Sequence, residues 1–174
     1  MAQSSGRGNG GNLLGRINSA DGSMCEFALP AGAKPHSVNI DRAGNARYTG
    51  NKNGTIGKLN SNTSKITVYP MSDSAARDPH TAVFDAAGIL WFTLQHSNMI
   101  GRLDPASGDV RQVTMKTSGA RPYGIKIDAR ACCGSRAMAA IAWCGLLRTA
   151  WNSLKSVCPT MRPPCVVSIS PATA

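Results

Sequence analysis

The sequence predicts an all-β fold, a partial β-propeller of about three four-stranded blades, followed by an irregular or helical C-terminal tail. Two observations predict it. A short motif recurs in steps of 42 and 44 residues, as LGRI at 14–17, IGKL at 56–59 and IGRL at 100–103. Turn-forming residues also separate short apolar runs throughout this region. A period of about 40 to 45 residues with glycine and aromatic markers is typical of propeller blades.

A second motif keeps the same spacing. Pro-His at 35–36 recurs at 79–80, and as Pro-Tyr at 122–123. An aspartate stands five places after the second residue of each pair, at Asp41, Asp85 and Asp128. We interpret these aspartates as turn residues that end the first strand of each repeat, a role that suits aspartate well.

Four strands are expected in each full repeat. They cover residues 80–85, 89–94, 99–104 and 110–115 in one repeat, and 36–41, 46–51, 55–60 and 65–70 in the repeat before it. Neighbouring blades bury each other's apolar faces, so Trp91 and Phe92 are expected between blades. Arg47 takes the place of Trp91 one repeat earlier, which would weaken that contact. The glycine of the recurring Ile-Gly motif fits a place where backbone or a neighbouring sheet comes close.

The repeat pattern divides the chain into three parts. Residues 1–13 are expected to be the remnant of a preceding blade, residues 14–128 the blades, and residues 129–174 an aberrant tail. The tail has no Asp or Glu and holds five of the six cysteines. One interpretation is translation out of frame. Another is a cationic amphipathic helix, because Trp143, Leu147, Trp151 and Leu154 have helical spacing. The cysteine spacing disfavours a zinc site.

Composition excludes some function classes. The chain carries 19 Lys and Arg against 9 Asp and Glu, a net charge of +10, but the basic residues lie singly. This scatter disfavours nucleic-acid binding. No apolar stretch reaches the length of about 18 residues that a membrane-spanning helix needs. The first residues lack the apolar region of a signal peptide, so a cytoplasmic protein is expected, although its true N-terminus can lie upstream.

With these motifs in view, residues 79–105 (PHTAVFDAAGILWFTLQHSNMIGRLDP) and 121–128 (RPYGIKID) resemble the repeats of the virginiamycin B lyase, or streptogramin B lyase, family. The resemblance covers residues 11–128. It implies a seven-bladed propeller, of which this chain holds fewer than three blades. It also implies the opening of a cyclic depsipeptide antibiotic by carbon–oxygen elimination, with a histidine as general base and a bound Mg²⁺.

The site residues follow from the motifs and the resemblance together. His80 is the first candidate for the general base, because histidine titrates near neutral pH. His36 holds the same repeat position, and Tyr123 holds it in the third repeat as a candidate substrate-binding residue. Asp78, two places before His80, is a weak candidate metal ligand. The resemblance implies a second carboxylate where Leu94 stands, so the Mg²⁺ ligand set is incomplete.

Several interpretations remain open. The histidines can instead be repeat residues that bond to backbone between strands, and His96 is expected to be a solvated loop residue. The lead function is a streptogramin B lyase-like carbon–oxygen lyase when the protein is complete, acting on a cyclic peptide lactone or another small ligand. The alternative is a non-catalytic propeller that binds a ligand, or an inactive gene fragment. Open blade edges also predict self-association.

Overall fold

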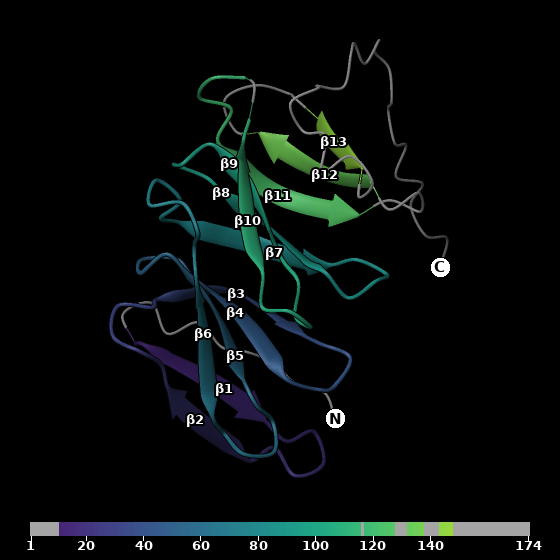
Figure 1. Ribbon diagram of the computed structural model, residues 1–174. Helices are drawn as coiled ribbons and strands as arrows, with labels where there is room; N and C mark the ends of the chain where they lie inside the picture. Colours follow the sequence, from purple (N-terminus) through teal and green to yellow (C-terminus); the bar gives the residue numbers. More distant parts are fainter. Residues whose placement is uncertain (1–10, 116, 128–131, 138–142, 148–174) are drawn as a thin grey trace, which may run out of the picture.

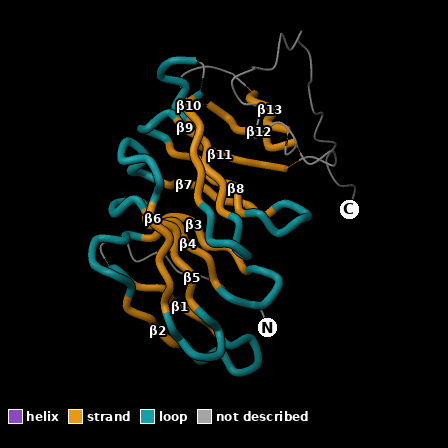
Figure 2. The backbone as a smooth tube through the Cα atoms, in the orientation of Figure 1, coloured by secondary structure: helices purple, strands orange, loops and turns teal. Residues whose placement is uncertain are grey.

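The computed structural model describes residues 11–115, 117–127, 132–137 and 143–147. They form strands joined by turns and loops, as Figure 2 shows, and no helix occurs among them. It follows that no helix in the described part of the chain is long and apolar enough to cross a membrane.

The strands form four antiparallel sheets that follow one another in chain order (Figure 1). The first sheet pairs β1 (Leu13–Ile17) with β2 (Met24–Ala28). The second contains β3 (Pro35–Ile40), β4 (Ala46–Gly50), β5 (Thr55–Leu59) and β6 (Ile66–Pro70). The third contains β7 (Pro79–Phe84), β8 (Leu90–Leu94), β9 (Met99–Leu103) and β10 (Val110–Thr114). The fourth contains β11 (Pro122–Ile127), β12 (Cys132–Ala137) and β13 (Trp143–Leu147).

This architecture confirms the predicted all-β partial propeller. Each strand expected between residues 36 and 115 is present, with small differences at its ends, and each four-stranded sheet is paired in chain order. The strands end where the turn residues stand. Asp85 Oδ1 accepts hydrogen bonds from the backbone N–H of Ala87 at 2.8 Å and of Ile89 at 3.0 Å, which closes the turn between β7 and β8. Asp41 does the same for the turn between β3 and β4, whereas Asp128 lies outside the described residues.

The apolar core lies between the sheets, as the repeat predicts. Phe92 is fully buried in a cluster that includes Ile56 and Ala76 of the preceding repeat. Trp91, its neighbour in β8, points to the opposite face and packs with Ile125 of the following sheet. Successive strand residues alternate between faces, so β8 is buried on both sides. Trp91 and Phe92 therefore join their blade to both of its neighbours.

The Ile-Gly motif needs glycine for a different reason from the one expected. A Cβ on Gly101 would lie 2.2 Å from Cε2 of Phe92, and a Cβ on Gly57 would lie 1.9 Å from Cζ of Tyr48. Each glycine is paired with that aromatic residue across its own sheet. The close neighbour is thus an aromatic ring of the adjacent strand, rather than backbone or another sheet.

Arg47 does occupy the repeat position of Trp91, and the structure shows how a charged residue fits there. Its side chain is 4% exposed, and Nε donates a hydrogen bond of 3.1 Å to Oδ2 of Asp41. Its guanidinium lies 5.4 Å from the centre of the Tyr69 ring. The ion pair and the aromatic face compensate for taking the charge out of water.

The fourth sheet corrects one expectation for the tail. Strand β12 pairs with β11, and β13 pairs with β12, so the blade pattern continues past residue 128. Trp143–Leu147 is a strand, so the helical interpretation of that segment is corrected. The remaining residues of the expected helix, Trp151 and Leu154, lie outside the described residues. Antiparallel pairing with β12 overrides the helical spacing of the apolar residues, since spacing is a weak signal over so short a run.

Candidate functional site

The first strands of three sheets lie side by side and bring the candidate residues together. Strands β3, β7 and β11 each form the edge of their sheet, and β7 contacts both of the others. In a propeller the blades are arranged around a central channel. Each of these strands begins with the recurring proline, so the residue after it takes an equivalent place in all three. Those residues are His36, His80 and Tyr123.

The three rings form a stack. The ring centroids of His36 and His80 are 3.5 Å apart with an angle of 32° between the planes. The centroids of His80 and Tyr123 are 4.4 Å apart at 47°. His80 therefore lies in the middle, with an imidazole on one side and a phenol on the other. Residues that are 44 and 43 positions apart in the chain thus bring their rings into contact.

Exposure differs along this ring stack. His80 is buried, with 7% of its surface accessible, whereas Tyr123 is 41% exposed. The Nδ1 atom of His80 is 3.0 Å from Oγ1 of Thr81, which fixes the orientation of the imidazole. In the tautomer whose Nδ1–H donates to Thr81, the lone pair is on Nε2. A ligand that approaches from solvent would meet the ring of Tyr123 first.

Each residue of the ring stack lies at an irregularity of its strand. The pairing of β3 with β4 shifts register between Pro35 and Val38, and that of β7 with β8 shifts between Pro79 and Ala82. The pairing of β11 with β12 shifts between Pro122 and Gly124. Such bulges often lie beside functional sites, where they redirect a side chain.

Two buried threonines beside the bulges were missed by the sequence analysis. Thr49 and Thr93 occupy the same repeat position and have no exposed surface. Their hydroxyls donate hydrogen bonds to the backbone carbonyls of His80 and Tyr123. The available signal was the recurrence of a threonine directly after Tyr48 and Phe92, at the same distance from each histidine.

The residues that precede the ring stack include two with strained backbone. Lys34 has φ of 42° and Arg121 has φ of 54°, values that non-glycine residues rarely adopt. Both conformations are supported by the preceding repeat. Oδ1 of Asn12 accepts from the backbone N–H of Lys34 at 2.9 Å, and Oδ1 of Asn98 accepts from that of Arg121 at 3.1 Å. Strain of this kind is concentrated at functional sites.

Asp78 is directed toward a turn rather than toward the ring stack. Its Oδ1 accepts from Ser97 Oγ at 2.7 Å, and its Oδ2 lies 3.0 Å from Nδ1 of His96. Burial alone would raise the pKa of the Asp78 carboxyl, but the hydrogen bonds from Ser97 and His96 outweigh it and hold the pKa below its ordinary value. His96 is largely exposed, as expected for a loop residue, yet it contacts this carboxylate.

The described residues do not form a Mg²⁺ ligand set. Within them, no group of three or more His, Cys, Asp or Glu side chains is placed to hold a metal ion. Both oxygens of Asp78 are engaged by residues 96–97, and Leu94 is fully buried in the core between blades. Mg²⁺ prefers several oxygen ligands, usually carboxylates and water. These side chains therefore do not fit the ion that the resemblance implies.

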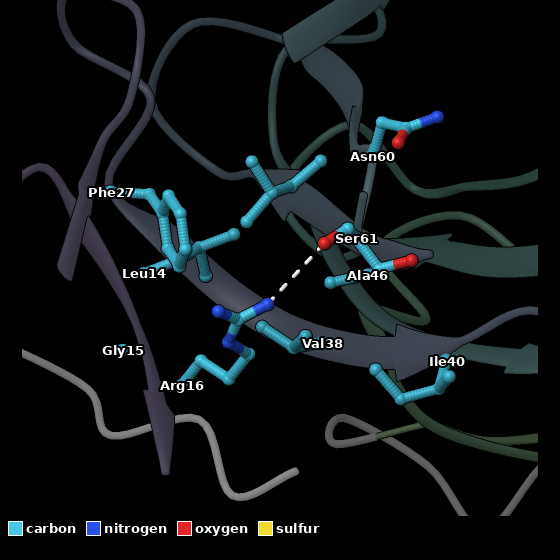
Figure 3. Close-up of a pocket in the computed structure, with 10 residues that line it drawn as sticks. Leu14, Gly15, Arg16, Phe27, Val38, Ile40, Ala46, Asn60 and Ser61 are labelled. Atoms are coloured by element: carbon cyan, nitrogen blue, oxygen red, sulfur yellow. Dashed lines mark hydrogen bonds between the residues drawn. The ribbon is translucent and has the colours of Figure 1, made fainter. Parts of the chain in front are cut away.

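A separate pocket lies between the first two sheets, away from the ring stack (Figure 3). It has a volume of about 50 Å³ and is lined by apolar residues of both sheets, including Leu14, Phe27 and Val38. Arg16 extends across it, and its guanidinium donates a 3.3 Å hydrogen bond to the carbonyl of Ser61. Ligand pockets are usually several hundred Å³ in volume. With its much smaller volume, this pocket is a gap in the packing between the two sheets.

Comparison with known proteins gives a consistent result. The sequence profile of the Virginiamycin B lyase family matches residues 7–139. A solved streptogramin B lyase is 23% identical, with a TM-score of 0.74, and the match covers 81% of this chain and 46% of that chain. A catalytically inactive virginiamycin B lyase from Staphylococcus aureus with quinupristin is 23% identical, with a TM-score of 0.74. This match covers 81% of this chain and 47% of that chain.

A further match supports the same fold. Selenomethionine-substituted virginiamycin B lyase from Staphylococcus aureus is 24% identical, with a TM-score of 0.65, and the match covers 78% of this chain and 48% of that chain. The chain thus spans about half the length of these solved structures. A search of curated proteins found no match. At this level of identity the structural matches show the fold.

Proposed function

Because this chain belongs to the virginiamycin B lyase family, we propose that the complete protein opens a cyclic peptide lactone of the streptogramin B class by carbon–oxygen elimination. The observation that carries this proposal is the ring stack, which places the imidazole of His80 between the rings of His36 and Tyr123. The family supplies the reaction class, and the stack supplies a histidine on the first strand of a blade, next to an exposed aromatic ring.

Elimination needs a base and no water. A base removes a proton from the carbon adjacent to the carbon that bears the ester oxygen. The electron pair of that C–H bond forms a C=C bond, and the C–O bond breaks so that the ester leaves as a carboxylate. Neutral imidazole suits the base because its conjugate acid titrates near physiological pH. In our proposal His80 accepts the proton at Nε2, while its Nδ1 is oriented by Thr81.

Tyr123 would contact the ligand. Its ring is the exposed end of the ring stack, so a ring or amide plane of a cyclic peptide can stack on it. His36 would support the other face of His80. A Mg²⁺ ion bound in the complete protein would supply Lewis-acid stabilisation of the developing charge, but Asp78 and Leu94 do not form its ligand set.

A second candidate function is a non-catalytic propeller that binds a small ligand at the same ring stack. Two observations favour it: the buried Leu94 stands at the position where the family resemblance implies a carboxylate, and Asp78 is already engaged by residues 96–97. Such a protein would retain the stacking surface of Tyr123 and lack the charge stabilisation that elimination needs.

One experiment separates the two candidates. The purified protein is incubated with quinupristin and Mg²⁺, and the products are resolved by liquid chromatography with mass spectrometry. Elimination gives a linear product of unchanged mass with a new C=C bond, whereas hydrolysis would add one water. We expect the unchanged-mass product from the lyase. Saturable binding without any new product would support the binding module.

Two variants test the residue that carries the proposal. His80→Ala removes the proposed base and should abolish turnover. His96→Ala removes an exposed imidazole that is not in the ring stack, so it serves as the matched control and should retain turnover. Equal activity in the wild type and His80→Ala would contradict the assignment of His80. If neither turnover nor binding occurs with the wild type, the proposed function is wrong for this chain.

A further inference from the structure

The same threonine bond occurs at two successive boundaries between blades. Oγ1 of Thr49 in β4 donates a 2.8 Å hydrogen bond to the backbone carbonyl of His80 in the next sheet. Oγ1 of Thr93 in β8 donates a 2.9 Å hydrogen bond to the backbone carbonyl of Tyr123 in the sheet after that. Both acceptors belong to residues of the ring stack. A contact that recurs one repeat later, with the same atoms, is a built feature of the fold.

Each threonine also bonds to the bulge of its own blade. The hydroxyl of Thr49 accepts from the backbone N–H of Ser37 at 2.9 Å, and that of Thr93 accepts from the N–H of Thr81 at 3.2 Å. Ser37 and Thr81 directly follow the two histidines. In a bulge, two residues of one strand face a single residue of the partner strand, so one backbone N–H lacks its regular hydrogen-bond acceptor. The threonine hydroxyl accepts the hydrogen bond from that N–H.

One hydroxyl therefore links two residues of the ring stack. A threonine hydroxyl has one donor and two acceptor lone pairs, so it can donate across the blade boundary and accept within its own blade. The β-branched side chain has few rotamers, which keeps the oxygen in a fixed place. Thr49 connects the backbone beside His36 to His80, and Thr93 connects the backbone beside His80 to Tyr123.

We infer that Thr49 and Thr93 are positioning residues that set the spacing of the ring stack by holding the backbone of each ring residue against the next. The inference deepens the proposed function, since it assumes that the stack is the surface that meets the ligand. The geometric part of it, that the hydroxyls control the ring spacing, holds or fails without any ligand.

The test replaces each hydroxyl and observes the rings directly. In Thr49→Val the methyl group keeps the shape and removes both hydrogen bonds, while Thr49→Ser keeps the hydroxyl. The imidazole protons of His36 and His80 are then assigned by NMR in the absence of ligand. Closely stacked rings shift each other's proton resonances. We expect Thr49→Val to move the resonances of His36 and His80 toward unstacked values, and Thr49→Ser to stay close to the wild type.

Two controls distinguish positioning from general destabilisation. The exposed ring of His96 is an internal reference whose resonances should not move. Thr55→Val is the matched variant, because Thr55 is also a buried threonine of the same sheet but its hydroxyl bonds to Oδ1 of Asn53 at 2.7 Å. It should lower stability without moving the stack. Unchanged His36 and His80 resonances in Thr49→Val would overturn the inference, as would equal shifts in Thr55→Val.

The variant is expected to fold. Other hydrogen bonds cross the same boundary. Among them, Asn39 Nδ2 donates to the carbonyl of Ala82 at 3.1 Å, and the N–H of Ala82 donates to Oγ of Ser37 at 3.2 Å. If Thr49→Val nevertheless fails to fold, Thr93→Val decides the matter at the next boundary. It should move the ring protons of Tyr123 and His80, and unmoved resonances there would overturn the inference.

Discussion

The indole Nε1 of Trp91 donates a hydrogen bond of 3.0 Å to Oδ2 of Asp85, six residues earlier in the same blade. One repeat earlier, Nε of Arg47 donates to Oδ2 of Asp41 at 3.1 Å. An aromatic and a charged residue thus perform the same local task, which is to anchor the aspartate that closes the first turn of the blade. The repeat preserves a hydrogen-bond donor at this position while the residue type changes.

This relationship predicts that Arg47→Met is strongly destabilising. It leaves the carboxylate of Asp41 partly buried without its cation, and breaking a buried ion pair costs about 3 kcal/mol. Arg111→Met is the matched control. Arg111 makes the same Nε to Oδ2 contact with Asp109 at 2.7 Å, but both side chains are exposed, so a change below about 0.5 kcal/mol is expected. Urea unfolding measures both, and similar losses in the two variants would contradict the prediction.

Gly101→Ala and Gly57→Ala should each be destabilising because the new methyl group would overlap Phe92 or Tyr48. Overpacking of this kind costs about 1–3 kcal/mol when rings and backbone must shift. Gly124→Ala is the control, since a Cβ there meets nothing within 4 Å and the residue is not in the left-handed region. Thermal unfolding should show a lower Tm for the first two variants. A Tm unchanged from the wild type would show that the rings relocate freely.

Burial raises the pKa of Tyr48 to about 12, from an ordinary value of 10.0. The folded state therefore favours the neutral phenol. The corresponding stability is fully present below pH 10 and is lost as the pH rises toward 12, by about 1.4 kcal/mol per pH unit. Tyr48→Phe should remove this part of the alkaline dependence. Unfolding free energies of both proteins between pH 8 and about 12 give the comparison.

The same variant tests a second point at neutral pH. The hydroxyl oxygen of Tyr48 is buried and has no hydrogen-bond partner among the described residues. Removing a buried polar group that lacks a partner is neutral or stabilising. Tyr48→Phe should therefore be at least as stable as the wild type at pH 7. A clear loss of stability would indicate that the hydroxyl has a partner, such as an ordered water.

The stability that Asp78 contributes should depend on pH in the opposite sense from that of Tyr48, and at low pH. The hydrogen bonds from Ser97 and His96 hold its pKa below the ordinary value of 3.8, so its contribution to stability is present above that value and is lost as the pH falls through the folded pKa. Asp78→Asn should cost about 1–3 kcal/mol at pH 7 because the amide can replace only some of these bonds. The difference from wild type should shrink below pH 4, and a constant difference from pH 7 to 3 would contradict the assignment.

Open sheet edges predict self-association. Among the residues that the structure describes, β1 is paired only with β2, and Met24 of β2 is 64% exposed. Unpaired edges and exposed apolar side chains are templates for pairing with another chain. Sedimentation velocity should show an apparent mass that rises with protein concentration. A single monomeric species over the whole concentration range would show that the edges are protected.

The recurrence of short motifs was sufficient to predict most of the fold. The spacing of Ile-Gly and of Pro-His placed the strands, and the expected turn role of Asp41 and Asp85 is confirmed by their hydrogen bonds to the following turn. The strands after residue 128 were harder to predict. Strand β12 has Gly134 and Ser135 near the positions where earlier blades have aromatic residues, so the motif that marks a blade was absent although its strand remained.

The sequence alone determined which residues occupy equivalent places in successive blades, because a residue's place along a strand follows from the period of the motifs. It therefore grouped His36 and His80, and placed Tyr123 with them. Only the tertiary structure decided that these rings stack at 3.5 and 4.4 Å, and that Asp78 binds residues 96–97 instead. The ring stacking is a contact between neighbouring sheets, and the Asp78 contacts join the residue before β7 to the turn after β8. A repeat period carries no information about either kind of contact.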